Sequence, residues 1–298
     1  MIDLKYHVYS LVAVFVALAA GVVIGIGIAG GAGGQASAIE KQRQAITDLR
    51  DRFRQYSDEL GRKQASMEDL TGDLKDVDTL VGGILPALVE GTLSGRRVAI
   101  IQMGAAGDVS RLQRTLAAAG GVVTSVTRIN TDFEFADAKR MAAAAQAVPP
   151  EFQQTDKPPQ DQVWGFFAST LAGGRPGSPL DPLAGAGILE PSGDYSRPCN
   201  LVVILSPAGD DARRVVEQFG GALLARLRSQ KLRVVAASPS RAQQEAVENP
   251  WHELDVPTAS HSDYAMGQVC IVEALMQGEG RYGIGPSQSI LPNRLLRR

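Results

Sequence analysis

The chain has 298 residues, of which 44% are hydrophobic, 21% charged and 5% aromatic. Its 30 Lys and Arg side chains nearly balance 32 Asp and Glu side chains, which gives a formal net charge of −2 at pH 7. The apolar share suffices for a folded core, whereas the lack of a basic excess and the few aromatic rings argue against a nucleic-acid-binding protein.

The N-terminal segment is strongly apolar. Between Tyr6 and Ile39 the only side chain that titrates near neutral pH is His7. A helix of about 20 apolar residues crosses a hydrocarbon layer of roughly 30 Å. We therefore predict a short tail over residues 1–7 and a transmembrane helix over residues 8–32, held in membrane lipid. Ala36-Ser37-Ala38 matches a signal peptidase site, so cleavage is the alternative, but the length of the apolar run favours a retained anchor.

Small residues recur every fourth position in this segment, at Ala13, Ala17, Gly21 and Gly25. This spacing lets two membrane helices approach closely, so Ala17, Gly21 and Gly25 are a candidate pairing face. The basic residues after the apolar run favour a cytoplasmic C-terminal part, whereas the signal-like N-terminus favours the opposite side. Because long domains translocate largely regardless of charge, we predict a single-pass cell-membrane protein with an extracytoplasmic C-terminal domain.

A heptad pattern follows over residues 38–85. A spacing of 3.5 residues keeps one apolar seam toward a partner helix, so we predict a coiled-coil stalk and a homo-oligomer, as a parallel dimer or larger assembly. The alternative is a stalk that folds back on its own domain. Polar Gln42 and Lys63 interrupt the seam and would set its register. The a positions are Ile39, Ile46, Phe53, Leu60, Met67, Leu74 and Val81, and the d positions are Gln42, Leu49, Tyr56, Lys63, Leu70, Val77 and Ile84.

Residues 96–298 show the pattern of an α/β domain. Four apolar runs read as strands and alternate with amphipathic helices, which predicts an open, mostly parallel sheet of about four strands with right-handed crossovers and helices on both faces. A Pro- and Gly-rich insertion at about residues 148–198 is expected to hold one short helix, Gln162–Leu171. The predicted strands are Arg97–Met103, Val122–Thr127, Asn200–Leu205 and Leu232–Ala237, and the longest predicted helix is Asp210–Ser229.

Catalytic motifs do not emerge from this domain. It has no Gly-x-Ser-x-Gly, His-Glu-x-x-His or Cys-x-x-Cys pattern, and three histidines in the chain give little room for a triad, so we do not expect an enzyme. The loop with Gly104, Gly107 and Asp108 joins the first strand to a helix and is a candidate ligand or partner loop, although it lacks a phosphate-binding fingerprint. Asp210 and Asp211 begin the longest helix, where acids usually serve as caps.

Soft metal ligands gather near the C-terminus. His252, His261, Met266 and Cys270 fall within 19 residues, and imidazole, thioether and thiolate together suit Cu(I). Met266, Cys270 and His261 are thus candidate ligands, and Cu(I) is a possible cofactor. The alternative is an ordinary buried helix face, because apolar residues surround Cys270. Cys199 and Cys270 fit either one disulfide or two buried thiols.

Both ends of the chain resemble the mycobacterial copper transport protein B (MctB-like) family. The opening Met1-Ile-Asp-Leu-Lys-Tyr-His-Val-Tyr-Ser-Leu-Val-Ala-Val-Phe-Val-Ala-Leu-Ala-Ala-Gly-Val-Val-Ile-Gly carries this likeness, together with Asp263-Tyr-Ala-Met-Gly-Gln-Val-Cys-Ile-Val-Glu-Ala-Leu, Gly280-Arg-Tyr-Gly-Ile-Gly and Ile290-Leu-Pro. The likeness spans essentially the whole chain. Tyr264-Ala265-Met266 departs from the Thr-Pro-Ala-like segment expected there.

The resemblance implies an envelope protein of copper homeostasis or efflux, and no copper ligand is carried over from it. Asp263 and Gln268 of the shared segment, and Arg281 and Tyr282 of the following turn, join the candidate ligand or partner residues. The turn residues could equally pin the C-terminus to the sheet. The family's proposed role as an outer-membrane pore fits poorly with one predicted span. The alternative function is a non-metal envelope scaffold whose domain binds a protein or cell-wall partner.

Overall fold

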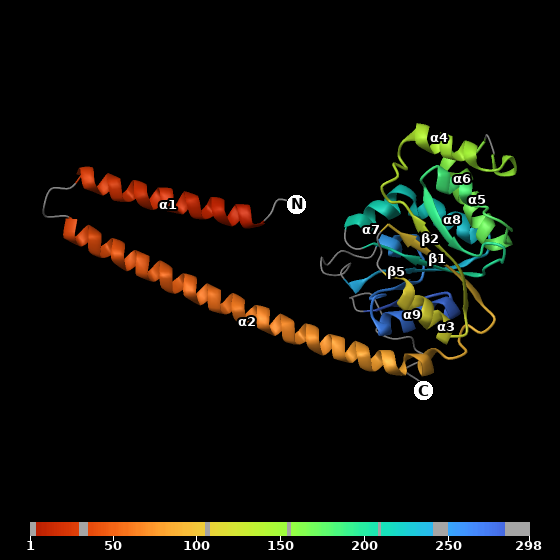
Figure 1. Cartoon of the computed structure of the whole chain (residues 1–298), viewed down its shortest axis with the longest axis horizontal. Helices are drawn as coiled ribbons and strands as arrows, with labels where there is room; N and C mark the ends of the chain where they lie inside the picture. Colours follow the sequence, from red (N-terminus) through yellow and green to blue (C-terminus); the bar gives the residue numbers. More distant parts are fainter. Residues whose placement is uncertain are drawn as a thin grey trace. The chain divides into compact units, whose positions relative to one another are not determined.

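The computed structural model describes residues 4–29, 35–104, 108–153, 156–207, 210–240 and 250–283. The chain divides into two compact units, Met1–Asp73 and Leu74–Arg298. The first contains helix α1 (Leu4–Ala29) and most of helix α2 (Gln35–Val89), and the second contains the end of α2 and an α/β domain (Figure 1).

Helix α1 coincides with much of the predicted membrane span. Its side chains from Leu11 to Ile24 are exposed, including Ala17 and Gly21 of the candidate pairing face. Gly25 lies in the later part of the helix, where side chains are outside the described set, as are residues 30–32 at the end of the predicted span. Within the described residues, no helix combines the length and the apolarity needed to cross a bilayer. Single-pass anchoring stays a prediction.

Helix α2 is continuous over 55 residues and passes through Pro86. Proline has no N–H to donate, and its ring crowds the carbonyl four residues earlier. That residue is Gly82, and burial of Leu85 and Val89 against the α/β domain helps to hold this last part of the helix in place. The final turns of α2 therefore belong to the second unit.

The predicted seam of α2 is exposed. Seven of its large a and d side chains have at least 51% of their surface accessible, so the described part of the chain leaves them uncovered. Pairing of two stalks stays a prediction. The exposed seam residues are Ile46, Leu49, Phe53, Tyr56, Leu74, Val77 and Ile84.

A mixed sheet forms the centre of the second unit. Its strands are β1 (Arg97–Met103), β2 (Val122–Ile129), β3 (Leu189–Gly193), β4 (Leu201–Leu205), β5 (Arg233–Ala237), β6 (Thr258–Ala259) and β7 (Arg281–Tyr282). They lie in the order β3-β2-β1-β4-β5-β6-β7. All neighbouring strands are parallel except β3, which pairs antiparallel with β2. The prediction of a mostly parallel sheet is confirmed.

The prediction of about four strands is wrong, because the sheet among the described residues has seven. The four predicted strands correspond to β1, β2, β4 and β5. Strands β6 and β7 have two residues each, too few for an alternating pattern to be recognised. Strand β3 contains Pro191, which argues against a central strand but is tolerated here because β3 lies at the sheet edge.

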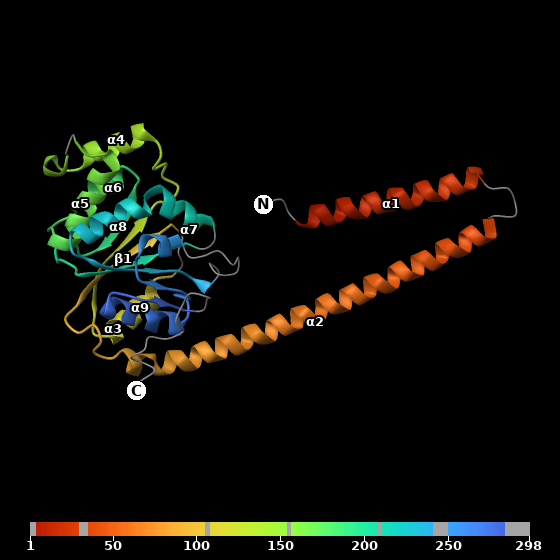
Figure 2. The same cartoon turned by 180° about the vertical axis from the view of Figure 1, so that it is seen from behind.

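Helices cover both faces of the sheet, as predicted (Figures 1 and 2). One face packs against α3 (Ser110–Ala118), α9 (Ala265–Gln277) and the end of α2. The other packs against α4 (Ala138–Ala147), α5 (Pro159–Gly173), α6 (Asp181–Gly185), α7 (Asp210–Val215) and α8 (Gly221–Ser229). Each face thus has its own apolar core.

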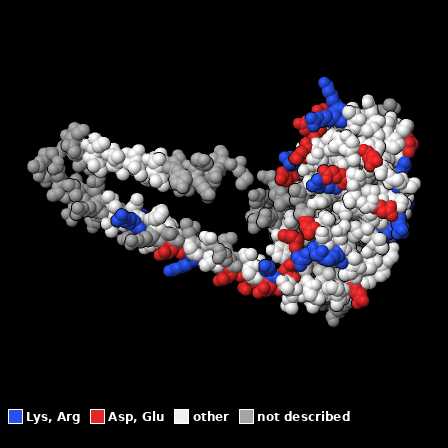
Figure 3. All heavy atoms as spheres, viewed as in Figure 1, with Lys and Arg blue, Asp and Glu red and all other residues white. Residues whose placement is uncertain are grey.

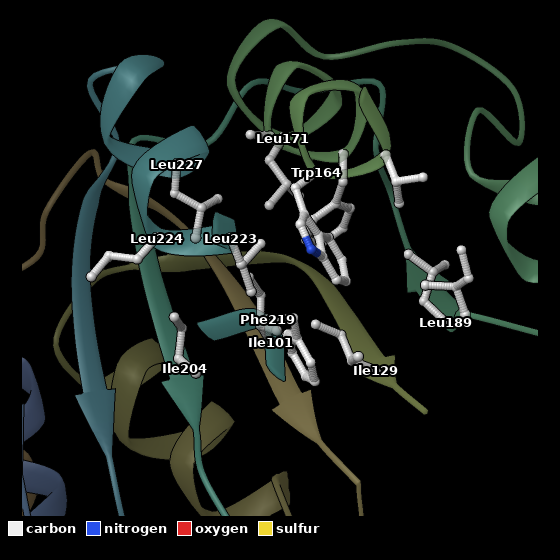
Figure 4. Close-up of a cluster of buried hydrophobic side chains, with 14 of the residues drawn as sticks. Ile101, Ile129, Trp164, Leu171, Leu189, Ile204, Phe219, Leu223, Leu224 and Leu227 are labelled. Atoms are coloured by element: carbon white, nitrogen blue, oxygen red, sulfur yellow. The ribbon is translucent and has the colours of Figure 1, made fainter. Parts of the chain in front are cut away.

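Aromatic side chains fill the core beneath α5 and α8. Trp164 and Phe219 lie with ring centroids 5.5 Å apart, next to Ile101 and Ile129 of the sheet (Figure 4). Each buried aromatic side chain removes roughly 150–250 Å² from water, so this cluster supplies much of the driving force for packing α5 on the sheet.

The insertion at residues 148–198 is more ordered than predicted. It contains a short 3-10 turn (Pro150–Phe152), α5, α6 and β3, and α5 includes the predicted helix Gln162–Leu171. The predicted helix Asp210–Ser229 is interrupted, because a π-helical segment at Val216–Gly220 separates α7 from α8. That segment places Phe219 in the aromatic core.

Candidate functional site

A cavity of about 900 Å³ opens where the carboxyl ends of β1, β2 and β4 meet the loops after β5 and β6. From β1 the chain crosses to β2 on one side, whereas β4 leads to β5 on the other. Ligands of open α/β sheets bind in the crevice that such a reversal creates. This cavity is therefore the candidate functional site.

Gly104 forms the cavity wall directly after β1. Its φ of +59° lies in the left-handed region, and an added Cβ would come within 2.6 Å of the Thr131 hydroxyl. Its N–H donates to the Ile129 carbonyl at 2.9 Å, which ties the loops after β1 and β2 together. Glycine is required here by backbone geometry and by the close approach of the second loop. Gly107 of the same predicted loop lies outside the described residues.

Asp108 lines the cavity just before α3. Its carboxylate accepts the Ser110 N–H at 2.9 Å. Hydrogen bonds from the Ser110 side chain and backbone, together with the Arg114 charge, hold the pKa of Asp108 below its usual value. The carboxylate is thus ionised at neutral pH and takes the place at the start of α3 that an anionic ligand would otherwise occupy.

Carboxylates dominate the lining of the cavity, with five acidic side chains against two arginines. Two of the acids are paired, Glu190 with Arg128 and Asp211 with Arg214 at 3.1 Å. Asp263 accepts hydrogen bonds from the Ser240 N–H at 2.8 Å and the Ser240 hydroxyl at 2.6 Å. Acidic and basic side chains are interspersed on the visible face of the second unit (Figure 3). The lining favours a cationic group over a phosphate.

Asp263 is also linked to helix α2, through its backbone carbonyl and the side chain of Arg111. Its carbonyl accepts from Arg111 at 2.9 Å, and Arg111 forms an ion pair with Asp78 of α2 at 2.7 Å. The Asp78 carboxylate in turn accepts the Ala265 N–H at 2.6 Å, at the first residue of α9. Tyr264, the residue before α9, makes no side-chain capping bond, so Asp78 serves as the cap from a distant part of the chain.

The other predicted partner residues lie outside the cavity lining. Gln268 is buried, where it accepts from Thr115 at 2.5 Å and donates to the Ser262 carbonyl at 3.3 Å. Arg281 donates to the His252 carbonyl at 3.2 Å, and the Tyr282 hydroxyl donates to Gln277 at 2.8 Å. These side chains bind α3, α9 and β7 to one another within the domain. Of the predicted ligand or partner residues, Gly104, Asp108 and Asp263 meet at one site.

Sequence reasoning missed Asn130, Asp132 and Arg128 in the lining, as well as Ser240 behind Asp263. Asn130 directly follows β2 and Asp132 lies two residues further on, whereas the predicted second strand ended at Thr127. The carboxyl end of that strand is the signal that could have identified both residues. Asp78 carried no comparable signal, because its partner Ala265 is 187 residues away.

The candidate metal ligands lie near the start of α9 and within it. His261 precedes α9 with φ +58°, and its Nδ1 is 2.9 Å from the Ser260 hydroxyl. Burial lowers the pKa of His261, an effect that the Asp263 charge partly opposes. Met266 is half-buried, whereas Cys270 is 1% exposed within the apolar core. In the described part of the chain, no group of three or more His, Cys, Asp or Glu side chains is arranged to hold a metal ion. Copper binding by Met266, Cys270 and His261 stays a prediction.

The two cysteines are thiols and form no disulfide. Cys199 belongs to the core beneath α5 and α8, and Cys270 belongs to the core on the opposite face of the sheet. Burial raises the pKa of each thiol to about 12. A disulfide between them is excluded because the sheet separates the two side chains.

Comparison with curated proteins found no match. A family described as "Copper transport outer membrane protein, MctB" matches residues 1–292, which confirms the resemblance seen in the opening and closing segments. Because this match covers α1, α2 and the α/β domain together, the chain belongs to the MctB family, and its membership implies a role in copper transport or homeostasis.

Proposed function

We propose that the protein is a single-pass envelope protein that is anchored in the cell membrane through α1, assembles through a coiled coil in α2, and acts in copper homeostasis or efflux through an extracytoplasmic α/β domain. The observation that carries the proposal is the family match over residues 1–292, which includes α1, α2 and the α/β domain. The exposed apolar seam of α2 supports assembly, since such a surface normally has a partner.

The cavity at the carboxyl edge of the sheet is the part of the domain that we assign to binding. Its acidic lining suits a cationic group on a ligand or on an envelope partner. One membrane helix per copy does not line a conventional channel, so we assign the protein an accessory role in copper movement rather than the role of a pore.

Measurements of copper content and copper tolerance in cells test the proposal. Cells that lack the protein should accumulate more copper and grow less well in added copper than cells that express the full chain. A version that begins at Gln35, without α1, should fail to restore normal copper content if anchoring is required. Equal copper content with and without the protein would contradict the copper role. Protease accessibility of a C-terminal tag in intact cells tests the predicted side of the membrane.

The non-metal scaffold is the second candidate function, and the burial of Cys270 at 1% exposure favours it. A Cu(I) titration of the full chain in detergent separates the two. If α9 handles copper directly, replacement of Met266 by Leu and Cys270 by Ala should lower the stoichiometry, whereas Cys199→Ala should not. Cys199 is the matched control because it is also a buried thiol, on the opposite face of the sheet. Unchanged binding in the double variant would remove support for direct handling by α9.

A further inference from the structure

The last turns of α2 have two apolar faces, and the α/β domain covers one of them. Leu85 and Val89 are buried against the domain, and Val81 packs beside them. Leu74, Val77, Leu80 and Ile84 remain 51–70% exposed, although they lie on the same few turns of helix. We name these four residues, together with Ile46, Leu49, Phe53 and Tyr56 earlier on α2, the stalk stripe.

The spacing of residues in the stalk stripe indicates that its partner is another helix. Seven of its eight members occupy a and d positions of one heptad register, and Leu80 adjoins them at a g position. Lys63 interrupts the apolar seam at a d position, and Val81, at an a position, packs against the domain of its own copy. A repeat of 3.5 residues stays in contact only with another helix that supercoils around it. A second copy of α2 has that repeat by construction, so each layer of one helix meets the same layer of the other.

We propose that the stalk stripe is the contact surface for a second copy of this chain, with the two α2 helices parallel, in register and paired as far as Ile84 at the edge of the α/β domain. This inference rests on the proposed function, because an anchor at the N-terminal end of every copy makes all stalks leave the membrane in the same direction. Antiparallel pairing within one membrane is excluded by that tether.

The charges beside the stripe include like-charge contacts that parallel pairing has to offset. Lys63 would place a positive charge at a d position in both copies, but it forms an ion pair with Glu59 of its own helix at 3.0 Å. In a parallel pair, a g residue of one helix lies near the e residue five positions later in the other. That rule brings Asp73 of one copy toward Asp78 of its partner. Both residues are acidic, so this contact is repulsive by itself. The ion pair of Arg111 with Asp78 at 2.7 Å, in which Arg111 is 35% exposed, reduces the negative charge that Asp73 of the other copy would meet.

Pairing through Ile84 has a consequence for the α/β domains. Ile84 precedes the end of α2 at Val89, and β1 begins at Arg97. A seam that remains paired as far as Ile84 therefore brings two α/β domains next to each other. Arg111 and Asp78, which hold the start of α9 and the Asp263 loop, then lie beside the dimer contact.

Cysteine cross-linking of the full chain in native membranes tests this arrangement. Leu49→Cys and Val77→Cys place thiols at two d positions, 28 residues apart along α2. In a parallel, in-register pair each thiol faces its own counterpart, whereas an antiparallel pair brings at most one position together. The matched control is Thr79→Cys, at an exposed f position on the outer side of the coil. Cys199 and Cys270 do not interfere, because both are buried with the pKa raised to about 12.

A short bismaleimide should link copies that carry Leu49→Cys and copies that carry Val77→Cys, at least about tenfold faster than copies that carry Thr79→Cys. The mass of the protein in detergent shows whether it contains two or more copies. If it does, and either d-position variant fails to cross-link, the parallel register is wrong but the proposed oligomer is not contradicted. A particle mass equal to one copy would contradict both the parallel register and the proposed oligomer. Unchanged thermal unfolding of each variant shows that the substitutions leave the domain folded.

Discussion

Gly267 in α9 is the residue whose replacement should destabilise the α/β domain most clearly. A Cβ at this position would lie 1.9 Å from the His261 carbonyl oxygen, 2.4 Å from the His261 carbonyl carbon and 2.6 Å from the Ser260 oxygen. Cβ atoms essentially never approach a heavy atom more closely than 3.0 Å. All three neighbours are backbone atoms, so no side chain can rotate away, and Gly267→Ala must push α9 from the β6 loop by about 1.1 Å.

That displacement disturbs a well-packed helix, since 10 of the 13 residues of α9 are buried. Overpacking a core costs about 1–3 kcal/mol, and the rigid backbone contact places Gly267→Ala at about 3 kcal/mol or more. For a domain of this size, 1 kcal/mol shifts the unfolding midpoint by about 2–4 °C, so we expect a decrease of roughly 6–12 °C. The start of α9 and the Asp263 wall of the cavity would move with it.

Thermal unfolding of the full chain in detergent, followed by tryptophan fluorescence, measures this effect. The chain has two tryptophans, Trp164 and Trp251, and both are buried in the α/β domain. Gly165→Ala in α5 is the matched control, because it lies in a helix with no atom within 4 Å of an added Cβ. The control should gain about 0.4–1 kcal/mol from the lower entropy of the unfolded chain. Equal midpoints for Gly267→Ala and the unaltered protein would refute the close-approach argument.

Three further predictions concern the cap of α9, His261 and the cysteines. Asp78→Ala removes the carboxylate that accepts the Ala265 N–H, so the free energy of unfolding in urea should decrease by about 0.5–2 kcal/mol. Asp78→Asn should decrease it less, because the amide oxygen still accepts this hydrogen bond. An unchanged free energy of unfolding in the alanine variant would exclude the capping role. Burial holds the pKa of His261 below 6.5, so the unfolded chain binds the proton first and stability falls as the pH decreases through that value. His261→Asn, which tolerates the positive φ, should lose less stability between about pH 7.5 and pH 5.5 in urea titrations, and an identical pH dependence would show that His261 does not contribute. Because the pKa of Cys199 and Cys270 is raised to about 12, both should resist alkylation by iodoacetamide at neutral pH until the domain unfolds; rapid labelling of the folded protein, detected by mass spectrometry, would contradict their burial.

The strands that could be predicted from the sequence are those with a continuous apolar run. The predicted Arg97–Met103 is β1 itself, and β4 and β5 lie within one residue of their predicted bounds. Central parallel strands are buried on both faces, which makes such runs unambiguous. The edge strands β3 and β7, and β6 next to β7, were not predictable, because they are short or contain proline and depend on neighbours for their hydrogen bonds.

The candidate site was predictable in part. The rule that ligands bind at the carboxyl ends of parallel strands pointed to Gly104 and Asp108, and both line the cavity. The spacing of Met266 and Cys270 predicts one helix face but does not say what that face contacts. Packing of α9 against the sheet decided that Cys270 lies in the core, because burial depends on neighbours from β4, β5 and β6 rather than on spacing within α9.

By itself the sequence determined the class of the domain, the heptad pattern of α2 and the apolar character of the N-terminal segment, because each depends on the order of apolar and polar residues along a continuous stretch of chain. Only the tertiary structure decided that the cysteines lie on opposite faces of the sheet, that Gly267 passes against a backbone carbonyl, and that Asp78 caps a helix 187 residues later. These features join residues that are distant in sequence and share no local pattern. They follow from the way the sheet and its helices bring those residues together.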